Sequence, residues 1–239
     1  MIPLGIKVKR LLITLITSSL FLATGFDYTY AAPEQNSKQS PFILGNDQRV
    51  ILIDAGHGGV DGGTSYGSTL EKDLTLAISR KLYLILRSNG LDAVLNRFDD
   101  YALSDENRWF PSSSRHRRDL TQRKGLADAI PTSVVVSIHV NWAPSSTKNG
   151  PLVLYRKEGR SYILAKAIQN QLNQLYDVNI RPEHGKPFFL LNKITATTVI
   201  VEAGFISSPI DRVKLYSPQG QKEIAKAIAN GIAVYLTEI

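Results

Sequence analysis

The sequence predicts a single α/β domain whose mostly parallel sheet is covered by helices on both faces. Short, continuous apolar runs are typical of strands that are buried on both faces. These runs alternate with segments whose apolar residues recur at helical spacing, which favours the α/β class. The length of 239 residues suits one such domain with a sizeable core and an additional export segment.

Six short apolar segments predict the strands, at residues 50–53, 92–95, 134–138, 152–155, 188–191 and 199–201. The first run is continuously apolar and the third is apolar except at Ser137, so both suit strands that are buried on both faces. No internal repeat interrupts the pattern, which indicates one domain rather than two.

Apolar residues at helical spacing predict four helices, at residues 74–86, 120–129, 164–175 and 224–236. Asn89-Gly90 supplies a stop signal after the first helix. Gly125 weakens the case for the second. Residues 97–114 show no periodicity and are predicted to form a long surface loop.

The N-terminal segment has the layout of an export signal. Basic residues at positions 7, 9 and 10 precede an apolar run at 11–26, and small Ala31-Ala32 follows. The run is shorter than the roughly 20 residues of a membrane span. We therefore predict a signal peptide or N-terminal anchor at residues 1–32, a polar linker at 33–48 and a folded domain at 49–239.

Composition limits the chemistry that the domain can use. The chain has no cysteine, which excludes disulfides, thiolate metal sites and a cysteine nucleophile. A bound metal must then be held by His, Asp or Glu, which favours zinc or manganese. The formal net charge of +7 suits an anionic partner. Because an exported protein rarely meets nucleic acid, we expect wall polymer instead, and membrane contact only through the N-terminal segment.

Four titratable residues stand at predicted strand ends or at a helix start. His57, His139 and Glu202 each follow an apolar strand, and Glu71 precedes the first helix. Carboxyl ends of parallel strands meet at one edge of a sheet, where α/β proteins bind ligands. Two histidines and one glutamate form a catalytic zinc set, and a second carboxylate can accept a proton from water. The sequence leaves open which glutamate binds the metal, although Glu71 is nearer to His57.

The segments DAGHGGVDGG, LEKDLTLAISRKL, SIHVN and VEAGFISSP resemble, in order and spacing, the signature blocks of the N-acetylmuramoyl-L-alanine amidase family 3. The resemblance covers about residues 50–237. It implies a single α/β domain with a mixed, mainly parallel sheet, and Zn²⁺ held by His57, Glu71 and His139. It also implies Glu202 as the catalytic carboxylate. The implied reaction is hydrolysis of the amide between N-acetylmuramic acid and L-alanine, which releases stem peptides from peptidoglycan.

The chain is also similar to the short, single-domain amidases of sporulation and germination that act on the spore cortex. It shares their N-terminal signal or anchor, an Arg-rich segment at residues 114–120 and the block His184-Gly185. This resemblance implies peptidoglycan as the partner, with an activating or anchoring protein as a second one. It places the enzyme outside the cytoplasmic membrane, in the cell wall or in the intermembrane space of the forespore.

Further candidates for substrate binding are Asn141, His184, Arg115, Arg117 and Arg118. Arginine forms forked bonds with carboxylates such as those of stem peptides, although a run of charges is usually solvated surface. Two other functions remain open. A non-catalytic peptidoglycan-binding module would be expected to lack one of the four titratable groups. A metal-dependent deacetylase of wall polymer would release acetate instead of peptide.

Overall fold

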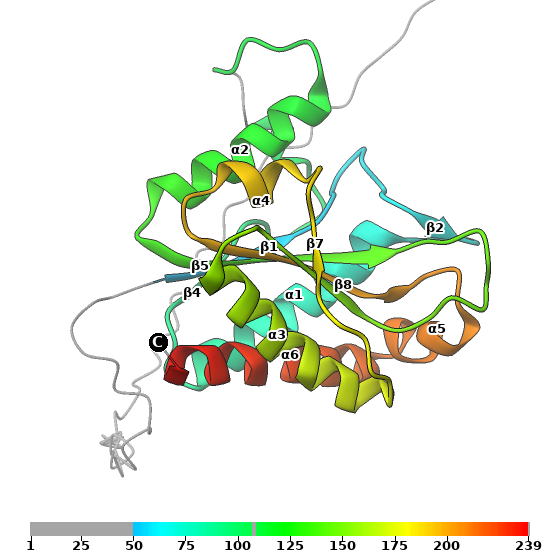
Figure 1. Ribbon diagram of the computed structural model, residues 1–239. Helices are drawn as coiled ribbons and strands as arrows, with labels where there is room; N and C mark the ends of the chain where they lie inside the picture. The colour runs from blue at the N-terminus through cyan, green and yellow to red at the C-terminus, as the bar shows by residue number, and fades with distance from the viewer. Residues whose placement is uncertain (1–49, 107–108, 239) are drawn as a thin grey trace, which may run out of the picture. The chain divides into compact units, whose positions relative to one another are not determined.

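The computed structural model describes residues 50–106 and 109–238, so the predicted export segment (1–32) and linker (33–48) lie outside the described residues. The described part contains a six-stranded sheet in the order β4-β1-β5-β8-β6-β7 (Figure 1). Its strands are β1 (Val50–Ala55), β4 (Ala93–Leu95), β5 (Thr132–Asn141), β6 (Leu152–Tyr155), β7 (Glu183–His184) and β8 (Thr197–Phe205). A separate two-stranded hairpin consists of β2 (Ser65–Tyr66) and β3 (Thr69–Leu70).

The sheet is mixed and mainly parallel, as the sequence and the family resemblance predicted. Strand β1 pairs in parallel with β4 and β5, and β5 pairs in parallel with β8. Strand β6 runs antiparallel to β8, with Leu152 opposite Glu202. The carboxyl ends of β1, β5 and β8 therefore meet at one edge of the sheet.

Helices cover both faces of this sheet. The larger layer contains α1 (Glu71–Ser88), α3 (Gly159–Tyr176) and α6 (Pro218–Glu238). The opposite layer contains α2 (Arg115–Ala129) and α4 (Phe189–Lys193), which lie together in Figure 1. A 3₁₀ turn, η1 (Leu103–Asp105), precedes α2, and α5 (Pro209–Tyr216) follows β8. Within the described residues, no helix has both the length and the apolar character needed to cross a membrane.

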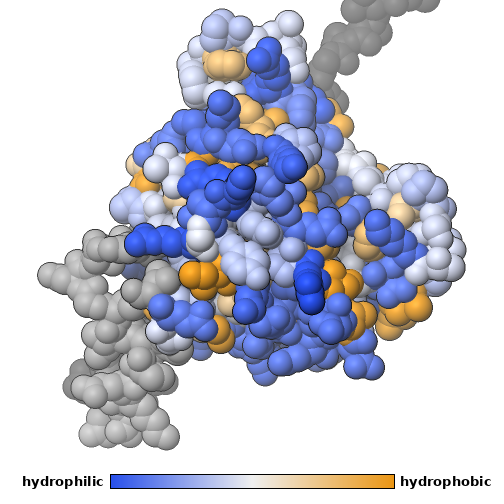
Figure 2. All heavy atoms as spheres, in the orientation of Figure 1, coloured by the Kyte–Doolittle hydropathy of each residue, from blue (hydrophilic) through white to orange (hydrophobic). Residues whose placement is uncertain are grey.

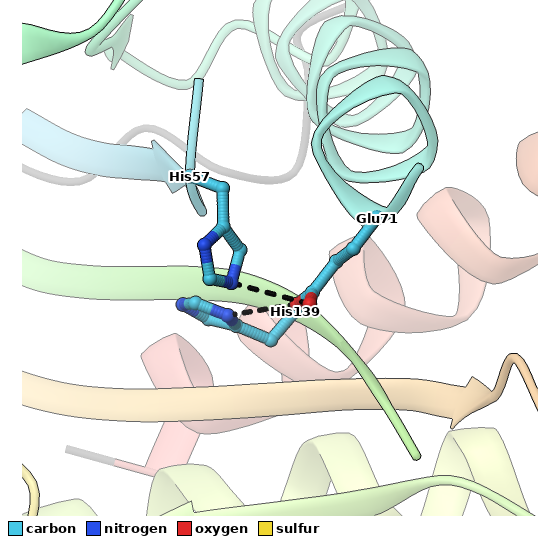
Figure 3. Close-up of side chains that lie close together, drawn as sticks. All are labelled: His57, Glu71 and His139. Carbon is cyan, nitrogen blue, oxygen red and sulfur yellow. Dashed lines mark hydrogen bonds and ion pairs between the residues drawn. The ribbon is translucent and has the colours of Figure 1, made fainter. Parts of the chain in front are cut away.

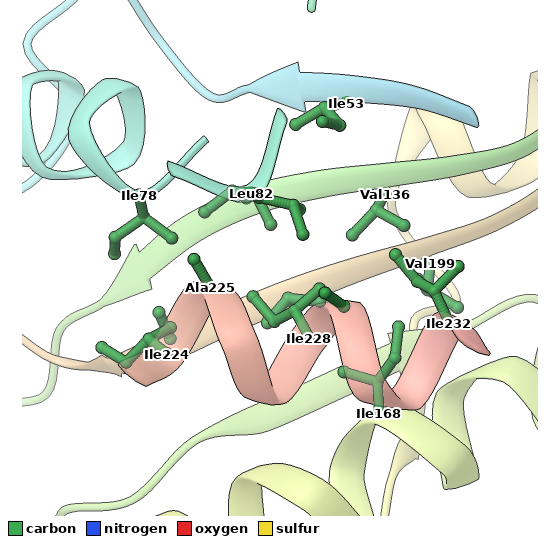
Figure 4. Packing of buried hydrophobic residues seen from close by; sticks show 14 of the residues in the cluster. Ile53, Ile78, Leu82, Val136, Ile168, Val199, Ile224, Ala225, Ile228 and Ile232 are labelled. Atoms are coloured by element: carbon green, nitrogen blue, oxygen red, sulfur yellow. The ribbon is translucent and has the colours of Figure 1, made fainter. Parts of the chain in front are cut away.

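Side chains that alternate between the two faces of the sheet form two separate hydrophobic cores. Val134, Val136 and Ile138 of β5 belong to the larger core, where α6 packs on the sheet (Figure 4). Val135 belongs to the smaller core beneath α2 and α4. Because successive side chains on a strand point to opposite faces, His139 continues the series of Val135 on the second face. Figure 2 shows that hydrophilic residues dominate one outer face of the molecule, as expected when the apolar residues are inside.

Two helical segments differ from the sequence prediction. Helix α2 begins at Arg115, five residues before the predicted start at 120, because the Ser114 side chain accepts a hydrogen bond from the Arg117 amide. The segment predicted as a strand at 188–191 forms helix α4 instead. An apolar run of four residues fits either structure, and here it packs as a helix on the smaller core.

The predicted surface loop at residues 97–114 is more ordered than expected. Arg97 is 1% exposed, and Leu103 in η1 is equally buried. The sequence prediction did not include α5 either. This helix starts with a Ser208 cap and Pro209, two recognised signals for a helix start. The buried side chains of Arg97 and Leu103 show that the segment after β4 contributes to the interior of the domain.

Candidate active site

Glu71, the first residue of α1, is the centre of the candidate site (Figure 3). Its side chain is almost completely buried. One carboxylate oxygen lies 3.2 Å from Nε2 of His57, and the other lies 3.1 Å from Nδ1 of His139. The two imidazoles therefore face the same carboxylate from the ends of two neighbouring strands.

Backbone amides fix the Glu71 carboxylate in this position. The Thr64 amide donates to Oε2 at 2.8 Å, and the Val140 amide donates to Oε1 at 3.0 Å. Burial raises the pKa of Glu71, but hydrogen bonds and charge interactions with His139 and His57 outweigh it. The net effect lowers the pKa well below its ordinary range, so Glu71 is a carboxylate at neutral pH.

His57, Glu71 and His139 form a group that fits one metal ion; we call it the His–Glu–His group. One ligand atom from each residue lies within 4.8 Å of the other two. The centroids of the two imidazole rings are 5.0 Å apart and the ring planes meet at 80°, so the rings lie edge to face and do not stack. Two imidazole nitrogens and a carboxylate are the donors that catalytic zinc sites use.

A glycine leaves room for the group. A Cβ atom at Gly63 would lie 2.5 Å from Glu71 Oε2 and 2.7 Å from the His57 ring. Gly63 also has φ +67°, a conformation that other residues rarely adopt. Only a glycine backbone can therefore pass this close to the donor atoms.

Asp61 is a further charged neighbour of His57. Its Oδ2 lies 3.1 Å from His57 Nδ1, although that nitrogen makes no hydrogen bond of good geometry among the described residues. Burial lowers the pKa of His57, but contact with Glu71 and Asp61 outweighs burial and raises it. A carboxylate behind a ligating histidine orients the ring and increases its basicity.

Glu202 lies beside the His–Glu–His group, on the neighbouring strand. It is the register partner of His139 in the β5–β8 pair and is partly buried. Burial raises the pKa of Glu202, an effect that Glu71 reinforces and His139 opposes. A raised pKa favours uptake of a proton by the carboxylate, which general acid–base catalysis requires.

Two of the residues predicted to bind substrate lie near the same edge. Asn141 ends β5, two residues after His139, and its side chain accepts a hydrogen bond from the Trp142 amide at 2.8 Å. Arg115 begins α2. Burial raises the pKa of Asp61, but His57, the Gly63 amide and, least of these, the charge of Arg115 outweigh burial and lower it. Arg115 is therefore within electrostatic reach of the His57 loop.

The other three predicted residues have different surroundings. Arg118 donates to the Ser112 carbonyl at 2.7 Å, and Arg117 is exposed on α2. His184 is the register partner of Tyr155 in the β6–β7 pair, and Tyr155 is in turn opposite Val199 in the β6–β8 pair. Val199 stands three residues before Glu202 on β8, away from the strand end that carries the group. The structure does not bring His184 to the His–Glu–His group, and its role in binding substrate stays a prediction.

The sequence analysis did not identify several residues that support the site. Asp61 stands four residues after His57 within a glycine-rich segment, which could have indicated its contact. Arg97 and Arg123 are both buried, and they donate hydrogen bonds to carbonyl groups of the His57 loop. No pattern of spacing or periodicity distinguishes them from surface arginines.

Comparison with known proteins agrees with the family that the sequence resembles. The sequence model of the family described as N-acetylmuramoyl-L-alanine amidase matches residues 51–234, most of the chain. The chain belongs to this family. This amidase therefore hydrolyses the amide bond between N-acetylmuramic acid and L-alanine in peptidoglycan, and the family predicted from the sequence is confirmed.

Individual relatives agree with the assignment. The amidase is 31% identical over 217 residues to the germination-specific N-acetylmuramoyl-L-alanine amidase of Bacillus subtilis, and the match covers 89% of each chain. Its fold is similar to that of the CwlD amidase from Clostridioides difficile, solved in complex with the GerS lipoprotein (TM-score 0.75, 33% identity, 80% of this chain and 100% of that one). The AmiC2 amidase of Nostoc punctiforme is also similar (TM-score 0.68, 32% identity, 80% and 98%).

Proposed function

We propose that this amidase is zinc-dependent, with His57, Glu71 and His139 as the metal ligands and Glu202 as the catalytic carboxylate. The main support is the convergence of both imidazoles on the Glu71 carboxylate, with ligand atoms within 4.8 Å of one another. The donors are nitrogen and oxygen atoms, and the chain has no cysteine, a combination that suits zinc.

Each residue has a distinct part in the reaction. When bound, Zn²⁺ supplies a Lewis acid and lowers the pKa of water at the site. Glu202 takes a proton from the water that attacks the lactyl carbonyl, and returns it to the nitrogen of L-alanine as the C–N bond breaks. Asp61 orients the His57 ring through its Nδ1 side. The products are a carboxylate on the glycan and a stem peptide with a free amine.

We further propose that the amidase acts outside the cytoplasmic membrane. Residues 1–32 would direct export or anchor the protein, 33–48 would link, and 49–239 would form the catalytic domain. Similarity to a germination-specific amidase supports a role in the spore cortex. The CwlD relative was solved with a lipoprotein, which supports an activating or anchoring protein as a second partner here.

Among the substrate-binding candidates, Arg115 and Asn141 are expected to contact the substrate, because Asn141 ends β5 two residues after His139 and the charge of Arg115 reaches Asp61. Arg115→Ser should raise KM and weaken the dependence of KM on salt, since it removes a cation beside the His57 loop. Arg160→Ser, at the exposed start of α3, is the matched control. Equal KM values for both variants, measured on purified muropeptides, would exclude Arg115 from the substrate-binding site.

A direct test uses the full chain with zinc and purified peptidoglycan, followed by mass spectrometry of the soluble products. We expect stem peptides that begin with a free L-alanine amine, and no products from His57→Ala or His139→Ala, which should also lose bound zinc. Release of acetate would instead identify a deacetylase. Binding without cleavage would identify a non-catalytic wall-binding module.

A further inference from the structure

The loop that carries His57 has an unfavourable backbone conformation. His57 has φ +60°, in the left-handed region, which costs a residue other than glycine roughly 1–2 kcal/mol. The carbonyl groups of Ala55, Gly56 and His57 lie next to one another along this turn. Buried carbonyls need donors, so the surroundings of these three groups decide whether the turn is stable.

Arg123 of α2 supplies donors to two of the three carbonyls. Its Nη1 donates to the Ala55 oxygen at 2.9 Å, and its Nη2 donates to the His57 oxygen at 2.8 Å. Two carboxylates hold the guanidinium in place: Asp119 accepts from Nε at 2.6 Å, and Asp54 accepts from Nη1 at 2.6 Å. Every nitrogen of this side chain therefore has a fixed acceptor.

Arg97 approaches the same turn from the segment after β4. Its Nη2 donates to the Gly56 oxygen at 2.9 Å, and its Nε donates to the Ala55 oxygen at 3.3 Å. The Thr75 hydroxyl adds a third donor, also to the Gly56 oxygen, at 2.8 Å. Arg97, Arg123 and Thr75 thus donate to all three consecutive carbonyls; together we call them the carbonyl clamp.

The burial of these arginines excludes a role in direct substrate binding. Arg97 is 1% exposed and Arg123 is 4% exposed. Burial lowers the pKa of Arg123, but the charges of Asp54 and Asp119 outweigh it and raise the pKa, so the guanidinium stays charged. Neither side chain can reach a ligand in solution, and both direct their donors at the His57 loop.

We propose that Arg97 and Arg123 are positioning residues for His57. The carbonyl clamp holds the turn in its left-handed form, so the imidazole faces Glu71 before a metal binds. This inference rests on the proposed role of His57 as a metal ligand. Outer residues that orient metal ligands typically contribute about 10- to 100-fold to metal affinity or activity.

Arg97→Lys and Arg123→Lys test the proposal, because lysine keeps the charge beside the buried carboxylates but loses the forked donors. Arg160→Lys, at the exposed start of α3, is the matched control. We expect both buried variants to bind zinc about 10- to 100-fold more weakly in competition with a chelator. Their Co²⁺ absorption spectrum should change and kcat should fall, whereas KM should stay near that of the parent.

A second readout does not depend on metal. In the metal-free full chain, the Gly58 and Gly59 amides are hydrogen-bonded to Asp61 and Asp100, and clamp variants should expose both amides to faster hydrogen exchange. A parent that binds no zinc would end the proposed metal role, while the exchange data would still test the clamp. Folded lysine variants with the exchange rates and zinc affinity of the parent would overturn the inference.

Thr75→Val gives a test that removes no charge. Valine has nearly the same shape as threonine but lacks the hydroxyl that donates to the Gly56 carbonyl. This variant therefore tests the role of the carbonyl clamp if neither lysine variant folds. We expect weaker zinc affinity and faster exchange at Gly58. Parent values for both quantities would contradict the proposal.

Discussion

At the scale of single residues, one carboxylate organises the site. Glu71 contacts two imidazoles and two backbone amides, and these four partners come from two segments of the chain, the β1–α1 connection and β5. From the sequence alone, a glutamate in the first turn of a helix is equally well explained by the helix dipole. Its function becomes apparent only when the strand ends bring His57 and His139 to it.

Glu202→Gln should separate catalysis from metal binding. Glutamine keeps the shape of the side chain but cannot accept a proton, and general acid–base catalysis contributes roughly 10²- to 10⁴-fold. We expect kcat to fall by that order while zinc content stays at the parent value. Glu183→Gln, on the exposed strand β7, is the control and should change neither. Turnover near that of the parent would show that Glu202 is structural.

Asp54 predicts a dependence of stability on pH. Burial raises its pKa, but Arg123 and the Ser137 hydroxyl outweigh it and lower the pKa below the usual value. Ionised Asp54 therefore stabilises the fold fully above about pH 3.9, its unfolded pKa, and this contribution disappears as the pH falls through the folded pKa.

Asp54→Asn tests this prediction in the metal-free protein. The substitution leaves Arg123 with one carboxylate fewer, and breaking a buried pair costs about 3–5 kcal/mol. We expect a lower free energy of unfolding at pH 7 and a smaller further loss below pH 4 than in the parent, both measured by urea titration. Parallel pH profiles for the two proteins would be inconsistent with a lowered pKa.

At the scale of elements, the segment between β1 and α1 brings backbone close to the donor atoms. Gly63 and Gly67 both have positive φ, but only Gly63 has neighbours where a side chain would begin; nothing lies within 4 Å of a Cβ at Gly67. Gly63→Ala and Gly67→Ala are therefore a matched pair with similar backbone strain. Zinc affinity should fall only in Gly63→Ala, because its methyl group would displace Glu71 or His57. Equal affinities, measured by chelator competition, would contradict the geometry.

The limits of elements with strong apolar patterns were predictable from the sequence, whereas the limits of elements that begin with polar residues were not. The strand at 152–155 has the same limits in the structure as in the prediction, because its apolar residues stand between polar turns. The first turn of α2 is a run of charged residues whose start is set by the Ser114 cap, which periodicity cannot reveal. Segments as short as α4 are ambiguous, since packing against the smaller core decides their conformation.

At the scale of the whole domain, the sequence predicted which groups meet but not what holds them. The order of the strands brings the ends of β1, β5 and β8 to one edge, and this follows from parallel pairing of apolar runs. The buried contacts of Arg97 and Arg123 depend on distances between segments far apart in the chain. Local patterns contain no information on such contacts, so the sequence prediction assigned Arg97 to a surface loop.

Stability and chemistry should be separable between the hydrophobic core beneath α6 and the catalytic edge of the sheet. Ile228 of α6 is fully buried in the larger core, and α6 supplies none of the four titratable groups. Ile228→Ala should lower the free energy of unfolding by about 2–5 kcal/mol and leave zinc affinity unchanged. Val234→Ala, partly exposed on the same helix, should cost less than about 0.5 kcal/mol. Loss of zinc affinity in folded Ile228→Ala would show that packing in the larger core is coupled to the metal ligands.

The position of β8 has a consequence for when activity begins as the chain folds. His57, Glu71 and His139 all precede residue 140, whereas Glu202 belongs to β8, which lies between β5 and β6. A partly assembled sheet without β8 contains every proposed metal ligand but lacks the carboxylate that moves the proton. With Glu202 as the proposed proton carrier, a chain in which β8 has not yet paired with β5 would hold the metal without cleaving peptidoglycan.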